Sequence, residues 1–387
     1  MKFFLIAGEL SGDRLGAALM VGLKRLLPEV NFAGVGGPLM QAEGLTSQFP
    51  MDELSVMGIA EVLPKYFHLK RRIAETSQAC IDFAPDAMIT IDSPDFCLRV
   101  AKLVRAASPV RTVHYVAPSV WAWRPKRASK MAHSVDQVLA LLPFEPPYME
   151  KAGMRCDFVG HPVVSEPVAD AAQVAEFRRE HGIGDAPLLL TLPGSRRSEV
   201  TRLCPIFGAA LKTVVKHRPD ARVVLPAAPN VAALVAELTA EWPVSPIILN
   251  PSDMALEQGL MQKRAAFAAA DVALAASGTV SLELAAAGTP MVIGYDMSWL
   301  SWQIMDRMRM IDTVTLVNLV SETRYVPEFL GPDCVPEKIG AALCTLLEDG
   351  TAQENQRQAM AVTMQRLGLG AEAPGLRAAR AVLDGLS

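Results

Sequence analysis

The chain has 387 residues, and its 37 basic and 41 acidic side chains give a formal net charge of −4. Single hydrophobic cores stop growing near ~250–300 residues, so this length predicts two domains. The nearly balanced charge gives no global signal for nucleic acid, which leaves only local phosphate sites. The six cysteines form no Cys-x-x-Cys pair, which argues against a zinc site or a disulfide framework.

Apolar runs alternate with amphipathic segments, which predicts an α/β protein with doubly wound, mostly parallel sheets. In the first half, the expected strands are 3–7, 32–35, 87–91, 111–116 and 137–142, with helices from about residue 14 and over 73–82 and 97–107. In the second half, the expected strands are 188–192, 222–225, 247–249, 272–275, 291–294 and 315–319. The two series predict two Rossmann-like domains, 1–165 and 166–345, that face a central cleft.

The N-terminal apolar run is similar to a signal peptide, but Glu9 ends it too early, and we expect the first strand there. No uncharged apolar run reaches the ~18–20 residues of a membrane span. Asp271 interrupts even the alanine-rich stretch 265–276. These observations predict a cytoplasmic protein that is soluble or peripheral to a membrane.

Ligands of open α/β sheets bind beyond the carboxyl ends of the strands. After the first strand, small residues form a turn into a helix, which lets a ligand approach Ser11, Gly12 and Asp13 closely. Alternatively, Ser11 and Asp13 only cap the helix. The turn lacks the Gly-x-Gly-x-x-Gly and Gly-Lys-Ser/Thr patterns, so dinucleotide and ATP binding are weak hypotheses.

Residues 57–72 combine an apolar group with basic side chains, which is the composition of a helix in an anionic membrane interface. The apolar members are Val62, Leu63, Tyr66, Phe67 and Leu69, and the basic members are Lys65, Lys70, Arg71 and Arg72. From the residues alone, an ordinary packed helix with a solvated basic face is an equal alternative.

Two carboxylates, Asp92 and Asp95, follow the strand 87–91 on a loop at the ligand edge. Asp92 can take a proton from an attacking hydroxyl, whereas for Asp95 we favour a cap on the next helix. The Asp-x-x-Asp spacing differs from the Asp-x-Asp metal pair of many sugar-nucleotide transferases. We therefore expect no metal and no cofactor.

The loop after the strand 111–116 brings together Ser119, Trp121, Trp123 and Arg124. Aromatic faces beside a cation suit a sugar or a phosphorylated glycan. A single tryptophan is often a core residue, but two at i and i+2 beside an arginine are less typical of a core alone.

The segment 188–200 predicts a strand, a tight turn and a helix. The turn carries Gly194, Ser195 and Arg196, and the helix start offers free backbone N–H groups and a positive dipole. This combination suits a diphosphate, and a capped helix with surface arginines is the alternative.

A second turn of this kind follows the strand 272–275. Ser277, Gly278 and Thr279 can offer hydroxyl and N–H groups to phosphate oxygens, and Glu283 lies one helical turn further on the same face. A carboxylate there can accept both hydroxyls of a ribose, although an ordinary cap with an acidic first turn competes. Two such turns in one domain favour a nucleotide site.

Five sequence blocks together resemble the lipid-A-disaccharide synthase family over nearly the whole chain, and the block 114–124 is highly specific. The blocks are Ala7-Gly8-Glu9-x-Ser11-Gly12-Asp13, Ile91-Asp92-x-Pro94-Asp95-Phe96, His114 to Arg124, Leu192-Pro193-Gly194-Ser195-Arg196 and Ser277-Gly278-Thr279. The resemblance implies a glycosyltransferase of the GT-B fold that acts on UDP-2,3-diacylglucosamine and 2,3-diacylglucosamine 1-phosphate. The implied products are the β-1,6-linked disaccharide 1-phosphate and UDP, made at the inner face of the bacterial inner membrane.

The resemblance also implies roles for individual residues. Asp92 is then the general base for the acceptor 6-hydroxyl in one inverting displacement, and Arg196 neutralises the departing diphosphate without a metal. Glu283 holds the ribose, and Asn318 matches a family position near the nucleotide. The departures, none of which removes a predicted catalytic group, are Ala117 where a Ser is common, Arg197 and Ser198 after the motif arginine, and Val317 where a Pro often sits.

The resemblance bears on membrane contact and assembly as well. Acyl-chain substrates favour the membrane hypothesis for the segment 62–72. The C-terminal helices in 346–387 are expected to cross back to the first domain or to a partner subunit, and the resemblance suggests an exchanged-tail homodimer. Two competing hypotheses share the nucleotide turns: a UDP-N-acetylglucosamine 2-epimerase, and a non-catalytic nucleotide-sugar binding protein.

Overall fold

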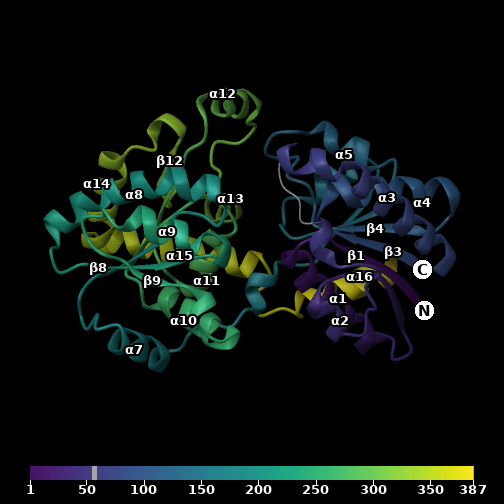
Figure 1. Cartoon of the computed structure of the whole chain (residues 1–387), viewed down its shortest axis with the longest axis horizontal. Helices are drawn as coiled ribbons and strands as arrows, with labels where there is room; N and C mark the ends of the chain where they lie inside the picture. Colours follow the sequence, from purple (N-terminus) through teal and green to yellow (C-terminus); the bar gives the residue numbers. More distant parts are fainter. Residues whose placement is uncertain (55–58, 387) are drawn as a thin grey trace. The chain divides into compact units, whose positions relative to one another are not determined.

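The computed structural model describes residues 1–54 and 59–386, and over 59–65 it describes the backbone alone. The chain forms two compact units (Figure 1). The first unit combines Met1–Ser165 with Gly370–Ser387, and the second is Glu166–Leu369. The C-terminal segment 346–387 is thus divided between the two units.

The first unit is built on a parallel six-stranded sheet with the order β2-β1-β3-β4-β5-β6. The strands are β1 (Lys2–Ala7), β2 (Asn31–Val35), β3 (Ala87–Ile91), β4 (Arg111–Tyr115), β5 (Gln137–Ala140) and β6 (Arg155–Phe158). The helices and 3-10 turns are α1 (Leu10–Leu26), α2 (Pro38–Ala42), η1 (Met51–Leu54), α3 (Ile59–Phe83), α4 (Pro94–Ala107), α5 (Lys126–Met131), α6 (Pro146–Glu150), η2 (Pro162–Ser165) and α16 (Pro374–Leu386).

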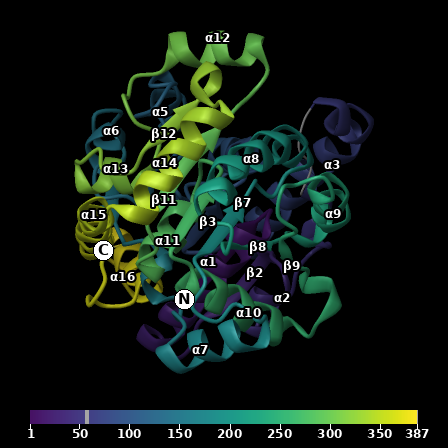
Figure 2. The ribbon, with the colours of Figure 1, turned by 90° about the vertical axis from the view of Figure 1, so that its left-hand side faces the viewer.

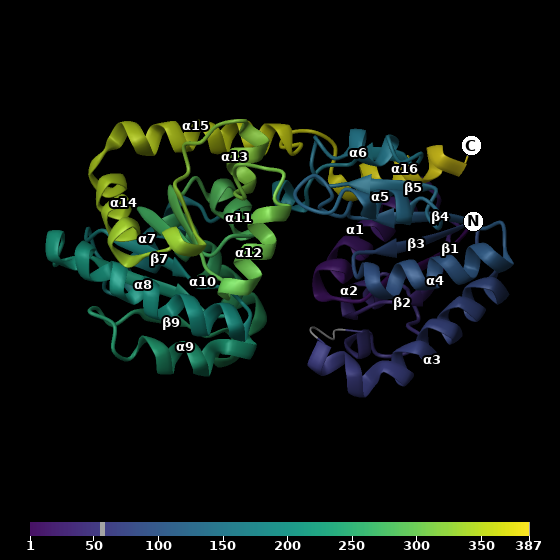
Figure 3. The same cartoon turned by 90° about the horizontal axis from the view of Figure 1, so that it is seen from above.

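Alternate residues of β1 pack against opposite layers of helices, as the two-residue period of a strand requires. Phe3 and Leu5 belong to the core that α1 and α16 cover, whereas Phe4 and Ile6 belong to the core formed with α3 and α4. Figure 3 shows α3 and α4 together in the first unit. Burial on both faces explains why β1 is a continuous apolar run.

The last helix returns to the beginning of the chain. α16 packs along α1, so the two ends of the sequence lie in the same unit (Figure 1). The helices approach closely at two glycines, since a Cβ on Gly22 would lie 2.6 Å from the carbonyl oxygen of Gly375.

The second unit repeats the architecture with a parallel sheet in the order β12-β11-β10-β7-β8-β9. Its strands are β7 (Leu188–Leu192), β8 (Arg222–Pro226), β9 (Ile247–Leu249), β10 (Val272–Ala275), β11 (Met291–Tyr295) and β12 (Glu328–Leu330). Its helices and 3-10 turns are α7 (Ala171–Glu180), α8 (Arg197–His217), η3 (Pro229–Val231), α9 (Ala232–Thr239), η4 (Pro251–Asp253), α10 (Leu256–Ala269), α11 (Val280–Ala287), α12 (Trp299–Met308), α13 (Leu316–Ser321), η5 (Gly331–Asp333), α14 (Pro336–Glu348) and α15 (Gly350–Arg366). α8 and α14 lie side by side over one core (Figure 2).

One predicted strand is wrong. In the segment 315–319, Thr315 is the N-cap and the other residues belong to α13. The edge strand beside β11 is instead β12, in which Glu328 pairs with Ile293. A short apolar run does not distinguish a strand from a buried helix, and here the helix packs against α15. The sequence prediction also omitted β6.

The predicted fold class is otherwise confirmed: the protein is α/β, with two Rossmann-like units of the GT-B type. A cleft between the units remains a prediction. In the described part of the chain, every helix is too short or too polar to cross a bilayer.

Candidate active site

Each sheet reverses its winding direction at one place, and ligands of doubly wound folds bind outside the strand ends there. In the first unit, the chain moves from β1 to β2 and then returns to β3 on the other side of β1. In the second unit, β8 and β9 lie on one side of β7 and β10 lies on the other. The reversals thus lie between β1 and β3 and between β7 and β10. The predicted loops follow these four strands: Ser11 follows β1, Asp92 follows β3, Arg196 follows β7 and Ser277 follows β10.

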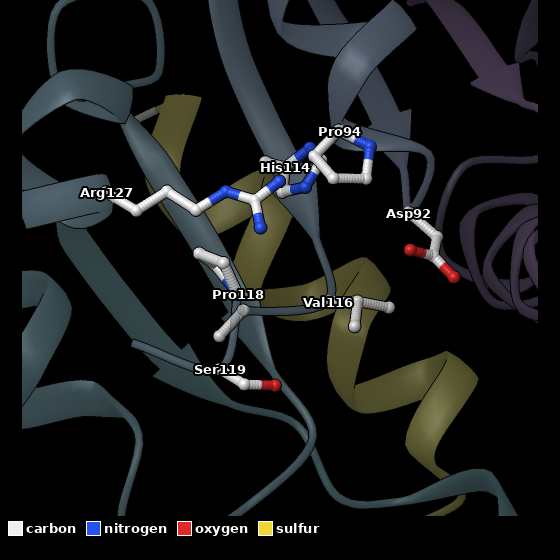
Figure 4. A pocket seen from close by; sticks show the side chains of 8 residues that line it. Asp92, Pro94, His114, Val116, Pro118, Ser119 and Arg127 are labelled. Atoms are coloured by element: carbon white, nitrogen blue, oxygen red, sulfur yellow. The ribbon is translucent and has the colours of Figure 1, made fainter. Parts of the chain in front are cut away.

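The first unit has a pocket of about 190 Å³ at the carboxyl ends of β3 and β4 (Figure 4). Its lining residues are Asp92, Pro94, His114, Val116, Ala117, Pro118, Ser119 and Arg127. The structure thus brings together two predicted site residues, Asp92 and Ser119. Trp121, Trp123 and Arg124 belong to the same loop as Ser119 but do not line this pocket.

The backbone around this pocket is held in left-handed conformations that side chains rarely adopt. The φ angles are +51° at Asp92, +42° at Ser93 and +86° at the β-branched Val116. Hydrogen bonds of 3.0 Å fix two of these residues, from Asp92 N to the oxygen of Tyr115 and from Val116 N to the oxygen of Leu139. Such strain is costly and is concentrated at functional sites.

Asp92 and Asp95 have different surroundings. Asp92 is partly exposed, and within the described residues its carboxylate has no hydrogen bond or ion pair. Asp95 is exposed in the first turn of α4, whose N-cap is Ser93 rather than Asp95. Asp92 therefore has the free carboxylate that lines the pocket.

Asp13 has a structural role that the sequence did not reveal. It is buried, and its two oxygens accept hydrogen bonds from Gly37 N (2.9 Å), Leu39 N (2.9 Å) and Met40 N (3.0 Å) at the start of α2. Asp13, which we expected to cap its own helix, α1, thus caps the start of α2 instead. Gly12 is buried as well, so Ser11 is the exposed polar side chain of this turn.

The two tryptophans of the specific block lie in different environments. Trp121 is buried, packs edge-to-face on Phe144 and donates from Nε1 to Glu145 Oε1 at 3.3 Å. Trp123 is partly exposed, and the guanidinium of the exposed Arg124 lies 4.0 Å from its ring centre. Trp121 therefore belongs to the packed interior beneath the loop surface, whereas Trp123 and Arg124 provide the aromatic and cationic groups that a ligand can reach.

Glu145 is a residue that the sequence interpretation missed. Besides Trp121, it accepts hydrogen bonds from Leu141 N (3.1 Å) and Leu142 N (3.0 Å). Burial raises the pKa of this carboxyl to about 7 despite these donors. No local pattern marks Glu145, because its role depends on a tryptophan 24 residues earlier.

Two residues that line the pocket, His114 and Arg127, were also missed. His114 is buried, and its Nδ1 shares a 2.7 Å hydrogen bond with Thr90 Oγ1. Burial, together with the charge of Arg127, lowers the pKa of His114 to about 4, so the ring is neutral at pH 7. Arg127 is partly buried and extends toward His114 (Figure 4). The basic run after Arg124 was the available sequence signal.

The described part of α3 gives a mixed result for the membrane hypothesis. Phe67 is 82% exposed and Tyr66 is 46% exposed, but Leu69 packs into the core formed with α4. The side chains of Val62 and Leu63 lie outside the residues that the structure describes.

The turn after β7 has the predicted glycine and arginine, but its donors are not free. Gly194 has a φ of +107°, which favours glycine. The carboxylate of Glu199 accepts hydrogen bonds from Ser195 N at 3.2 Å and Arg196 N at 3.3 Å, and it lies 3.4 Å from the Arg196 guanidinium. The expectation of free N–H groups at these two residues is therefore wrong, because a side chain within the helix caps them.

The turn after β10 and its neighbours also have internal partners. Gly278 and Thr279 are exposed and Ser277 is partly exposed. Glu283 Oε2 pairs with Lys263 Nζ at 2.5 Å. This turn keeps exposed groups for a ligand, and the Glu283 carboxylate is shared with a lysine.

Asn318 is buried, and both ends of its amide are used by the fold. Nδ2 donates to Val326 O at 2.9 Å and to Thr313 Oγ1 at 3.3 Å, and Oδ1 accepts from Val326 N at 3.1 Å. The structure thus gives Asn318 the role of joining α13 to the segment that precedes β12. In residues 1–54 and 59–386, no cluster of three His, Cys, Asp or Glu could hold a metal ion.

Residues 3–374 match the family model described as lipid-A-disaccharide synthetase. A lipid-A-disaccharide synthase from Ruegeria pomeroyi is 66% identical over 386 residues, which cover 100% of this chain and 96% of the relative. A lipid-A-disaccharide synthase from Rhodospirillum centenum is 48% identical over 387 residues, covering 99% of this chain and 94% of the relative.

Solved structures share the fold at low sequence identity. The UDP-GlcNAc 2-epimerase from Neisseria meningitidis, bound to UDP-GlcNAc, has a TM-score of 0.67 and 13% identity, with 100% of this chain and 99% of that chain covered. A MurG structure from Acinetobacter baumannii has a TM-score of 0.55 and 14% identity, with 100% and 98% covered.

Proposed function

Because the chain belongs to the lipid-A-disaccharide synthase family and is therefore a glycosyltransferase, we propose that it joins UDP-2,3-diacylglucosamine to 2,3-diacylglucosamine 1-phosphate. The observation that carries the proposal is the Asp92 carboxylate, which is unpaired within the described residues and lies on a strained loop in the pocket at the carboxyl ends of β3 and β4. A base at this place suits the activation of an acceptor hydroxyl.

In the proposed reaction, Asp92 accepts the proton of the acceptor 6-hydroxyl. The 6-oxygen attacks C1 of the donor sugar while the bond from C1 to the diphosphate breaks, and UDP leaves with that electron pair. One displacement inverts C1 and gives the β-1,6 linkage. Positioning of the two substrates supplies much of the rate, since it can be worth ~7–11 kcal/mol.

The second unit is the proposed nucleotide site. Arg196 neutralises the charge that develops on the departing diphosphate, without a metal. Ser277 to Thr279 lie near the phosphates, and Glu283 binds the ribose. Support comes from the exposure of Arg196 and of the turn after β10, at the place where the second sheet reverses its winding. A structure of the same fold, bound to UDP-GlcNAc, adds weight to a UDP-sugar ligand.

The proposal includes contact with the cytoplasmic leaflet of the inner membrane, where the acylated substrates would reside. Tyr66 and Phe67 on α3 expose aromatic rings beside the exposed Lys70 and Arg71, a combination that suits an anionic interface.

We also propose a homodimer, because α16 is a separate C-terminal helix whose contact with α1 could equally be made by the tail of a second copy.

A UDP-release assay tests the function. The wild type should release UDP only with both lipid substrates present, and with unchanged rate in EDTA. An epimerase would convert the donor without an acceptor, and a binding protein would release no UDP. UDP release that stops in EDTA would refute the metal-independent mechanism.

Asp92→Asn tests the base. It should lower kcat by roughly 10²–10⁴-fold, the range for loss of a general base, with little change in the KM of the donor. Asp95→Asn on the same loop is the matched control and should retain near-normal turnover. Near-normal turnover of Asp92→Asn would transfer the role to Asp95.

A further inference from the structure

The pocket of the first unit contains a cationic side chain that has no partner among the described residues. Arg127 lines the pocket beside Asp92, His114 and Ser119. Its side chain is partly buried, and within the described residues its guanidinium makes no hydrogen bond and no ion pair. By contrast, the neighbouring Arg124 rests on the Trp123 ring.

In the part of the chain that the structure describes, no negative charge pairs with Arg127. His114, which lines the same pocket, is buried and neutral at pH 7, so it supplies no negative charge. Asp92 lines the same pocket but forms no ion pair with Arg127, and Figure 4 shows its carboxylate directed away from the guanidinium. A guanidinium has five N–H donors and matches carboxylate or phosphate oxygens, so a bound anion would satisfy it.

We propose that Arg127 binds the phosphate monoester of the acceptor sugar, with Asp92 at the 6-hydroxyl of the same sugar. The inference rests on the proposed function and adds the subsite that selects a phosphorylated acceptor. The acceptor carries its phosphate on C1 and its reacting hydroxyl on C6, the exocyclic carbon attached to C5, so the two groups occupy separate positions on one sugar. A cation and a base that share a pocket without pairing match these two groups.

The size of the pocket agrees with this ligand. Its volume of about 190 Å³ is below the ~300–1,000 Å³ of pockets for drug-sized ligands, so it suits a monosaccharide without its acyl chains. The donor diphosphate is the other source of phosphate oxygens. The second unit has its own turns for that group, at Arg196 and at Ser277 to Thr279, which favours the acceptor phosphate at Arg127.

The test compares two acceptors, 2,3-diacylglucosamine 1-phosphate and the same lipid without phosphate, at saturating donor. Arg127→Gln should lower kcat/KM for the phosphorylated acceptor roughly 10- to 100-fold, the effect of losing a charge-assisted contact. Its kcat/KM for the dephosphorylated acceptor should stay within about twofold of the wild type. Arg127→Lys should keep part of the preference. Lys126→Gln, which removes an exposed charge next along α5, should behave as wild type.

Three outcomes would overturn the proposal. Arg127→Gln could lose equal activity with both acceptors, could change neither, or could instead raise the KM of the donor, which would assign Arg127 to the donor diphosphate. A binding measurement separates this proposal from the reaction itself. Glucosamine 1-phosphate should raise the melting temperature of the wild type, and Arg127→Gln should require roughly tenfold more of it for the same shift. If the wild type transfers to neither acceptor, the proposed reaction fails, and this titration alone decides the phosphate subsite.

Discussion

At the scale of single residues, Glu199 occupies the donors that a diphosphate would use. Its carboxylate accepts hydrogen bonds from Ser195 N and Arg196 N and lies beside the Arg196 guanidinium. An internal anion at a helix start satisfies the same groups that bind phosphate in other proteins. In the proposed nucleotide complex, the diphosphate must therefore displace Glu199 or bind against its negative charge.

Glu199→Gln removes this charge and keeps an oxygen that can still cap the helix. We expect UDP to bind roughly 3- to 10-fold more tightly, the scale of one like-charge contact at a helix terminus. Equilibrium titration with UDP measures the change, and Glu176→Gln, on the exposed surface of α7, is the control. Weaker UDP binding would mean that the Glu199 carboxylate holds the turn in its binding shape.

Glu145 provides a prediction about pH. Burial raises its pKa from 4.5 to about 7, so between these pH values the unfolded chain has released the proton while the folded chain retains it. The folded state therefore loses relative stability as the pH rises through this range, by on the order of 3 kcal/mol in total.

Glu145→Gln removes this titration. The melting temperature of Glu145→Gln relative to wild type should be higher at pH 8 than at pH 5. Glu150→Gln, exposed on α6, should show no such dependence. An equal difference at both pH values would contradict the raised pKa.

At the scale of elements, α3 combines a packed half with an exposed aromatic pair. Leu69 is partly buried against the core formed with α4, whereas Tyr66 and Phe67 are 46% and 82% exposed and pack on each other with their ring centres 5.6 Å apart. Exposed aromatic rings next to basic residues favour a bilayer surface. An assay with lipid vesicles can test whether a bilayer contacts Tyr66 and Phe67.

Phe67→Ser should lower flotation with anionic vesicles several-fold, because it removes the most exposed aromatic ring of α3. Leu103→Ser changes an apolar residue of α4 that is 44% exposed, and it should not alter flotation. Both variants should keep the wild-type melting temperature within a few degrees. Unchanged flotation of Phe67→Ser would remove α3 as a membrane contact.

The sequence predicted most strands of this fold because their signals are local. β1 and β7 are buried on both faces, and a continuous apolar run indicates such strands directly. The segment 315–319 carries the same apolar run but is helical, since packing against α15 decides its conformation and no local pattern reports that contact.

The candidate site shows the same division between local and distant information. Asp92 and Arg196 were identifiable because each follows a strand. The partners of Asp13 are 24 to 27 residues away, and Asn318 bonds across the loop to Val326, so their structural roles were hidden in the sequence. Glu145 was missed for the same reason.

At the scale of the whole molecule, the first unit is completed by the end of the chain. α16 supplies Ala378, Ala379 and Val382 to the core that β1 and α1 share. Gln137 on β5 also donates to the carbonyl oxygen of Ala381 at 2.7 Å. The stability of the first unit therefore depends on residues that follow the whole second unit in the sequence.

The close approach of α1 and α16 gives a test of this dependence. A Cβ on Gly22 would lie 2.6 Å from the carbonyl oxygen of Gly375, so Gly22→Ala must push the helices apart. The loss of stability should be ~1–3 kcal/mol, more than the ~1 kcal/mol that alanine gains over glycine in a helix. Gly350→Ala, where a Cβ would contact no other atom, should be neutral or slightly stabilising.

Hydrogen exchange locates the effect. In Gly22→Ala, amides of β1 and α16 should exchange faster, while those of β7 in the second unit should keep their wild-type rates, because the contact that is lost belongs to the first unit alone. Faster exchange throughout both sheets would instead mean that the two units unfold as one, and that the C-terminal helix stabilises the whole chain.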